Sequence, residues 1–203
     1  MLRSTNILAN LTLAAWLLAD VVRIAVAMEG LPGGLIDVLT CVGFVLAAIF
    51  VLARPPPIRQ DVRVDSALIA LAAALWPMLL VKLPASTPEP TTFVWVCQAV
   101  ALAGLLVSIL YLGRNFSLLP QYRDIVARGP YRLVRHPIYG CYLVFDATLV
   151  IQSASALAAC LWLFEGLLFL ARARREEQLL LASDAHYRAY VERVRYRLVP
   201  LIL

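Results

Sequence analysis

The side chains best suited to chemistry lie in a basic stretch where residues 135–139 read Arg-His-Pro-Ile-Tyr. His136 is one of only two histidines, and Pro137 suits the first turn of a helix, where its missing N–H would have no partner anyway. The free N–H groups and the positive dipole end of such a turn favour a carboxylate or another anion. Tyr131 and Tyr139 add aromatic faces that can pack on a planar base or a sulfonium. The stretch therefore predicts a site for a polar, charged ligand.

A second candidate element lies about 35 residues further along the chain. Arg172 and Glu176 are four residues apart, so they share one face of a helix and can hold a ligand at a lipid–water boundary. The neighbouring Arg174, Arg175 and Glu177 fit a solvated flank with local ion pairs. We therefore keep only Arg172 and Glu176 as candidates from this element.

These candidates are set in a chain that must lie in a membrane. Of its 203 residues, 62% are hydrophobic and 15% are charged, whereas a soluble domain carries about a quarter charged residues. Apolar stretches cover residues 7–27, 35–53, 66–83, 92–112 and 138–171. A helix needs about 20 residues to cross the hydrocarbon, so the first four stretches fit one crossing each.

The fifth stretch is too long for one crossing and short for two. We interpret it as a helical hairpin with its turn at residues 152–155, which gives six membrane segments, or five if it is one broken helix. The sequence thus predicts an all-α, polytopic membrane protein. Pro77 is expected to kink the third helix, and the tail after residue 171 to form two helical pieces, the second ending at Pro200.

The 17 arginines concentrate in the second and fourth connections and in the tail. The positive-inside rule then places both termini and these connections in the cytoplasm. With both termini in the cytoplasm, the chain must cross the membrane an even number of times, so the fifth stretch must cross twice, as a hairpin. Because membrane topology explains the net charge of +5, a nucleic-acid partner is the weaker explanation.

Several polar residues fall inside the apolar stretches. Asp20 and Arg23 are three residues apart and can pair with each other. Asp146 and Glu165 lie inside the fifth stretch, where ionisable groups are either functional or structural, and the sequence leaves both readings open. The four cysteines are far apart and lack metal-ligand spacing, so neither a disulfide framework nor a metal site is predicted.

The order of the motifs carries a family resemblance. Gly129-Pro-Tyr-Arg precedes the run 135–139, followed by the hairpin, Glu176-Glu177-x-x-Leu180, Tyr187-x-x-Tyr190 and Pro200. This order resembles the isoprenylcysteine carboxyl methyltransferase family, which is related to the membrane phospholipid methyltransferases, over about residues 110–200. The chain departs from the family's eukaryotic members at residues 183–186, which leaves the prenylcysteine substrate open.

The resemblance implies an S-adenosylmethionine-dependent methyltransferase with a cytoplasmic cofactor pocket. Arg172 would meet the substrate, and Arg172 and Glu176 would be the catalytic pair. The residues implied to contact the cofactor are Arg123, Asp124, Ile125, Val126, Tyr131, His136, Pro137, Ile138, Tyr139 and Glu176.

The acceptor is expected to be a lipophilic small molecule, a lipid or a lipid-modified substrate that presents a carboxylate, a thiol or an amine. Residues 1–112 would form the membrane scaffold and the acceptor site, and residues 113–203 the catalytic region. The Arg-rich, Lys-poor composition favours a bacterial inner membrane. Two alternatives stay open, namely a non-catalytic protein that binds anionic lipid through its basic loops and a sterol-type membrane reductase.

Overall fold

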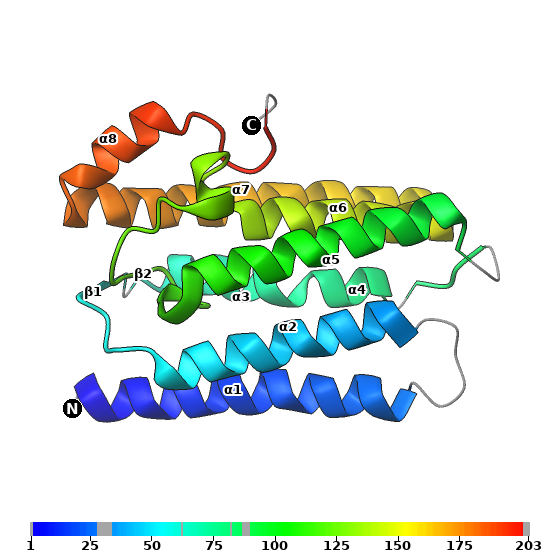
Figure 1. The fold of residues 1–203 in the computed structure, drawn as a ribbon, viewed down its shortest axis with the longest axis horizontal. Coiled ribbons are helices and arrows are strands. Elements are labelled where there is room, and N and C mark those ends of the chain that lie inside the picture. Colours follow the sequence, from blue (N-terminus) through cyan, green and yellow to red (C-terminus); the bar gives the residue numbers. More distant parts are fainter. Residues whose placement is uncertain (1, 28–33, 62, 82, 87–89, 201–203) are drawn as a thin grey trace.

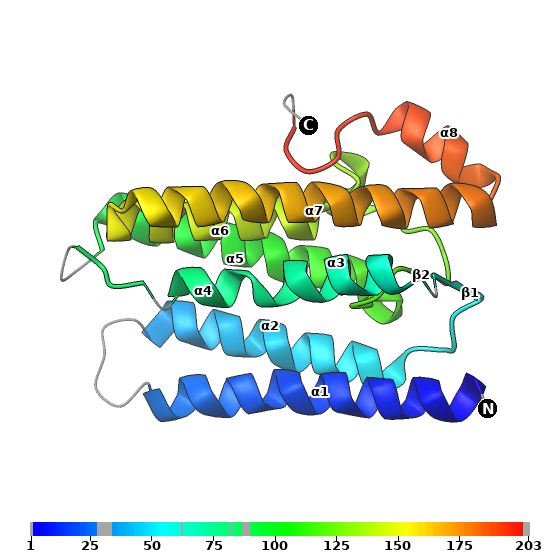
Figure 2. The same cartoon turned by 180° about the vertical axis from the view of Figure 1, so that it is seen from behind.

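The computed structural model describes residues 2–27, 34–61, 63–81, 83–86 and 90–200. Its long helices lie side by side along the long axis of the molecule (Figure 1). One end of this bundle carries the N-terminus, a short β-ribbon and the last helix, as the reverse view also shows (Figure 2). The chemistry-bearing loop between residues 113 and 136 lies at this same end, which we call the loop end.

Helices make up most of the chain, as the sequence predicts. The α-helices are α1 (Leu2–Ala27), α2 (Gly34–Ala53), α3 (Val64–Leu75), α4 (Pro77–Val81), α5 (Thr92–Leu112), α6 (Pro137–Ser153), α7 (Ala156–Ser183) and α8 (His186–Arg193). Two 3-10 turns, η1 (Gly113–Asn115) and η2 (Gly129–Arg132), lie in the long loop. The strands β1 (Arg59–Gln60) and β2 (Gln121–Tyr122) pair antiparallel and tie that loop to the connection after α2.

Four stretches of the described chain are long and apolar enough to cross a membrane: Gly34–Ala53, Val64–Val81, Thr92–Asn115 and Ala156–Ser183. These coincide with three of the predicted single crossings and with the second half of the predicted hairpin. The first predicted crossing forms α1, which is not among the four. The chain is thus a helical membrane protein. The number of membrane segments, five or six, stays a prediction.

The third crossing is broken where the sequence predicts a kink. Pro77 has no N–H to donate within a helix, and α3 ends one residue before Trp76, with α4 starting at Pro77. The indole N–H of Trp76 donates to the carbonyl oxygen of Leu161 at 2.9 Å. The break is therefore anchored to α7.

The predicted hairpin is confirmed, with its turn inside residues 152–155. Ala154 adopts a left-handed conformation (φ 47°) that ends α6, and Ser155 precedes α7. The two helices differ in length: α6 has 17 residues and α7 has 28. At 1.5 Å per residue α7 is about 42 Å long, so it extends beyond the end of α6 at the loop end.

The predicted end of the tail is wrong. A second helical piece forms after the break at Asp184, but α8 ends at Arg193 rather than at Pro200. The following residues instead run back over the start of α6. There the carbonyl oxygens of Tyr196 and Arg197 accept hydrogen bonds from the N–H groups of Arg135 and His136, at 2.9 and 2.7 Å. These non-local bonds replace the helical ones, which explains why local sequence did not reveal this segment.

Candidate active site

The start of α6 is fixed from both sides. Pro137 occupies the first turn, as predicted, with His136 as the preceding cap residue. The carbonyl oxygen of Leu198 lies against Gly140 so closely that a Cβ atom there would be 2.3 Å away. The C-terminal segment thus covers part of the turn at which the sequence predicts an anion site, and it holds His136 in place through the backbone.

Glu176 contacts three side chains, two at the start of α6 and one on α7. Its Oε1 accepts a hydrogen bond from the Tyr139 hydroxyl at 2.7 Å and pairs with Arg172 Nε at 3.0 Å. Its Oε2 lies 3.5 Å from His136 Nδ1. The predicted residues of the two separate motifs therefore form one cluster at the loop end of α6 and α7.

Glu177 is the centre of a second cluster, and the prediction that it belongs to a solvated flank is wrong. The residue is only 5% exposed. Its carboxylate pairs with Arg135 Nε at 3.0 Å, with Arg197 Nε at 3.1 Å and with His136 Nε2 at 3.3 Å. His136 therefore bridges Glu176 and Glu177, one on each ring nitrogen.

Nothing in the local sequence distinguishes Glu177 from a surface glutamate. Its burial comes from the C-terminal segment, which brings Arg197 to it across 20 residues. Its neighbour Arg175 behaves as expected for the flank, because it pairs at the surface with Asp65 of α3.

Arg172 connects the cluster to the long loop. Its Nη2 donates to the carbonyl oxygens of Ser117 and Leu118, at 3.3 and 2.7 Å. Its guanidinium also lies over the ring of Tyr139, which in turn stacks on Phe169 with ring centroids 5.0 Å apart. The side chain is thus buried, charged and held in one orientation, as a group that orients a ligand must be.

The loop before α6 contributes a buried cation and a buried phenol. Arg123 donates to the carbonyl oxygen of Pro55 at 2.9 Å and to the Gln121 side chain at 2.6 Å. Burial, with the nearby charge of Arg54, lowers the pKa of Arg123 to about 10, so it stays cationic at neutral pH. Burial raises the pKa of Tyr131, so its hydroxyl stays neutral.

One cavity of about 480 Å³ joins these groups to the membrane core. It is lined by Arg172, Glu176 and nearly all residues that the resemblance implies for the cofactor, namely Arg123, Asp124, Ile125, Val126, Tyr131, His136, Ile138 and Tyr139. Pro137 is the exception, because it shapes the start of α6 without lining the cavity. Arg135, Tyr187 and Tyr190 also line it.

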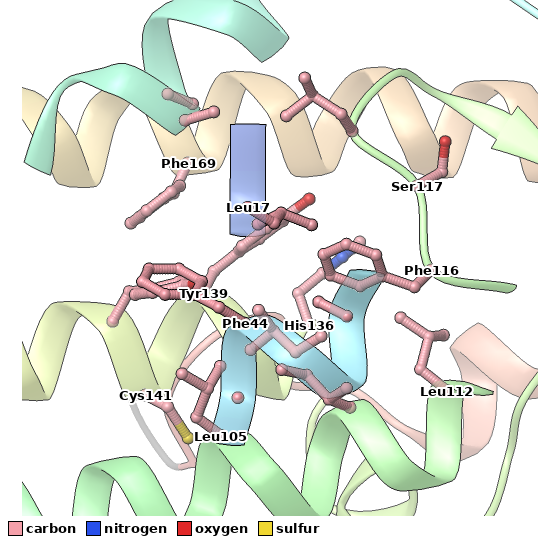
Figure 3. A pocket seen from close by; sticks show the side chains of 18 of the residues that line it. Leu17, Phe44, Leu105, Leu112, Phe116, Ser117, His136, Tyr139, Cys141 and Phe169 are labelled. Carbon is pink, nitrogen blue, oxygen red and sulfur yellow. The ribbon is translucent and has the colours of Figure 1, made fainter. Parts of the chain in front are cut away.

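The other half of the cavity is apolar and comes mostly from the first half of the chain. Leu17 of α1, Phe44 of α2 and Leu105 of α5 face the same space as His136 and Tyr139 (Figure 3). The cavity reaches Asp20 and Arg23 near the opposite end of α1, which form the predicted ion pair at 3.0 Å. A ligand with a polar end and a long apolar part fits such a space.

The match to a known family covers the elements that build the polar half. Residues 92–182 match the isoprenylcysteine carboxyl methyltransferase (ICMT) family. Compared with the predicted extent of about residues 110–200, the matched segment begins earlier, with α5, and ends before α8. No curated protein matches the chain.

The chain is therefore a helical membrane protein whose residues 92–182 are similar to the ICMT family. Within this segment, α5 supplies an apolar wall, α6 supplies His136 and Tyr139 at its start, and α7 supplies Arg172 and Glu176. Within the part of the chain that the structure describes, no group of three or more His, Cys, Asp or Glu side chains is arranged so that it could hold a metal ion. The helices α1 to α4, which enclose the apolar half of the cavity, lie outside the ICMT match.

Proposed function

We propose that the protein transfers the methyl group of S-adenosylmethionine to a lipophilic acceptor that enters from the membrane. The observation that carries this proposal is a cavity among the described residues that is polar at the loop end and mostly apolar along α1, α2 and α5, with Asp20, Arg23 and Asp37 at its far end. A polar cofactor and an apolar acceptor would meet where the two halves join. The family of residues 92–182 supports the methyl-transfer chemistry.

The charges of the polar half suit the cofactor. Arg135, Arg172 and Arg197 face the two carboxylates of Glu176 and Glu177, which leaves one positive charge in excess. Arg135 and Arg172 are buried, whereas Arg197 is partly exposed, and an excess positive charge at this site favours an anionic group, such as the carboxylate of the methionine moiety. Aromatic rings of α8 on the same cavity offer faces on which an adenine base can stack.

Methyl transfer from a sulfonium needs little acid–base machinery, because the donor is already activated. The cofactor, when bound, supplies an electrophilic methyl group. The protein's part is to align the acceptor with that group and to exclude water. We assign the orientation of the acceptor to Arg172, and the positioning of the cofactor to His136 and Glu176.

A binding measurement tests the proposal directly. Purified protein in detergent should bind S-adenosylmethionine and S-adenosylhomocysteine, measured by calorimetry, and should not bind NADPH. Binding of NADPH alone would favour a sterol-type reductase. Binding of neither nucleotide, together with retention on vesicles of anionic lipid, would favour the non-catalytic alternative.

A further inference from the structure

The hairpin holds two carboxyl groups below the proposed cofactor site. Asp146 of α6 is 2% exposed and Glu165 of α7 is fully buried. They lie on the two packed helices of the hairpin, where their charges influence each other. Oδ2 of Asp146 and both oxygens of Glu165 have no hydrogen-bond partner among the described residues. The described ion pairs include neither residue.

Such a pair cannot carry two charges. Two adjacent carboxylates in an apolar site repel each other, and each has lost its solvation. The pair therefore holds at least one proton, as other close carboxyl pairs do. With one proton bound, it is a base that can take up a second proton.

Through Asp146, the pair has access to the apolar half of the cavity, where we propose that the acceptor binds. Asp146 lines the cavity, as do Tyr139 and Tyr142 of the same helix. These residues follow one another at spacings of three and four, so they share one face of α6. Asp146 lies about 10 Å further into the membrane than Tyr139, at 1.5 Å per residue. The Glu176 cluster and Asp146 thus open onto the same cavity from the same face of α6.

We propose that Asp146, held by Glu165, takes the proton of a protic methyl acceptor, an amine, a thiol or a hydroxyl. This inference rests on the proposed function. In the step, the bond between the acceptor's nucleophilic atom and hydrogen breaks, and its electron pair forms the new bond to the methyl carbon. The S–CH3 bond of the cofactor breaks, its electrons stay on sulfur, and the proton goes to the Asp146–Glu165 pair. Asp146 is then a catalytic residue and Glu165 a positioning residue.

The proposal separates two acceptor classes. A carboxylate acceptor has no proton to lose, so methylation of a carboxylate does not need the pair. A thiol or an ammonium ion must lose a proton to become a nucleophile, and a buried base at the acceptor wall serves that purpose. The pair therefore favours a protic acceptor over the carboxyl acceptor that the family's name specifies.

Other ionisable groups surround the pair and enter any pH profile. Cys141 and Tyr142 lie on α6 itself, Cys97 and Tyr111 lie on the packed helix α5, and Arg172, Asp20, Arg23 and Asp37 line the cavity. Of these, Tyr142 and Arg172 interact with each other, and Tyr142 also with Asp146. Substituting Asp146 and Glu165 singly identifies which part of the profile belongs to the pair.

The test uses three probes with the same apolar chain, decylamine, decanethiol and decanoate. The full-length protein in detergent is incubated with each probe and methyl-labelled S-adenosylmethionine. We expect the amine or the thiol to be methylated faster than decanoate. Asp146→Asn should slow the protic probe at pH 7 by about 10²-fold, the usual contribution of a general base. Glu165→Gln should give a smaller loss.

The pH profile distinguishes a proton acceptor from a structural residue. In Asp146→Asn the probe must lose its proton to solvent, so the rate should rise tenfold per pH unit and approach that of the parent protein at high pH. Thr148→Val is the matched control, because Thr148 is equally buried on α6 and its hydroxyl accepts from the Gln98 side chain and donates to the carbonyl oxygen of Phe145. It should lower stability without changing the shape of the profile.

A readout without cofactor completes the test. The infrared band of the protonated carboxyl pair, assigned by its loss in Asp146→Asn, should shift when decanethiol or decylamine binds to the apoprotein. Equal turnover of decanoate by the parent protein and Asp146→Asn, with no protic probe methylated, would overturn the inference. An unchanged pH profile for the protic probe in Asp146→Asn would do the same. Failure of the proposed function would appear separately, as no binding of S-adenosylhomocysteine by the parent protein.

Discussion

The guanidinium of Arg172 lies over the ring of Tyr139, 5.2 Å from its centroid, and both side chains bind the same oxygen, Oε1 of Glu176. The catalytic candidate of α7 and a cofactor candidate of α6 thus share one carboxylate. Because the three groups constrain one another, a change at one affects the orientation of the others. The predictions below use this coupling and the contacts around it.

Replacing Arg172 with Ala should lower the rate of methyl transfer by about 10²–10³-fold, the usual effect of removing a charged group that acts in the transition state. Binding of S-adenosylhomocysteine should weaken by less than about tenfold, equivalent to 1.4 kcal/mol, because Glu176 keeps its bonds to Tyr139 and His136. Labelled methyl transfer and calorimetry measure the two effects. Arg172→Lys keeps the charge but loses the planar guanidinium. Its rate of methyl transfer should therefore lie between those of Arg172→Ala and the parent protein. Equal losses in turnover and binding would contradict the assignment of Arg172 to the acceptor.

Replacing Glu177 with Gln should destabilise the protein by about 3–5 kcal/mol, because Arg135 would remain buried without its charge partner. The unfolding midpoint in detergent measures this effect. Asp65→Asn is the matched control, since it removes the acid of the half-exposed pair with Arg175 and should change stability by less than about 1 kcal/mol. Similar midpoints for the two variants would show that Glu177 is not the buried centre of its cluster.

Gly140→Ala tests the approach of the C-terminal segment to α6. The new Cβ would lie 2.3 Å from the carbonyl oxygen of Leu198, so the segment must move and the backbone bonds to Arg135 and His136 should weaken. We expect lower stability and weaker binding of S-adenosylhomocysteine. Gly166→Ala on α7 serves as the control, because its Cβ would meet only ordinary contact at 3.8 Å. That variant should be neutral or slightly more stable, since Ala favours a helix by about 1 kcal/mol over Gly.

Ala101→Phe should obstruct the apolar half of the cavity. Ala101 is buried and lines the cavity on α5, so a bulky ring there takes space from the acceptor. Methylation of decyl probes should fall sharply while S-adenosylhomocysteine still binds. Val100→Phe places the same ring at the adjacent position, which is 65% exposed on the outside of α5, and should leave turnover unchanged. Loss of cofactor binding in Ala101→Phe alone would mean that the two halves of the cavity are not separate sites.

Local rules accounted for the elements that the sequence predicted correctly. The apolar stretches, the break at Pro77, the start of α6 at Pro137 and the turn near Ala154 depend on residues that are neighbours along the chain. The contact between Arg172 and Glu176 follows from their spacing of four within one helix. The family resemblance rested on motif order in this same half of the chain, and residues 92–182 match that family.

What the sequence by itself determined is therefore the helical membrane architecture, the hairpin and the two motifs. Only the tertiary structure decided that Glu177 is buried, that the C-terminal segment returns to His136 through Arg197, and that Asp146 meets Glu165 beside the cavity. Likewise, only the folded chain showed which residues of α1 and α2 line the cavity. Hydrophobic periodicity and turn chemistry are set by adjacent residues. Burial and the pairing of distant side chains arise from how the helices pack, and no local pattern encodes them.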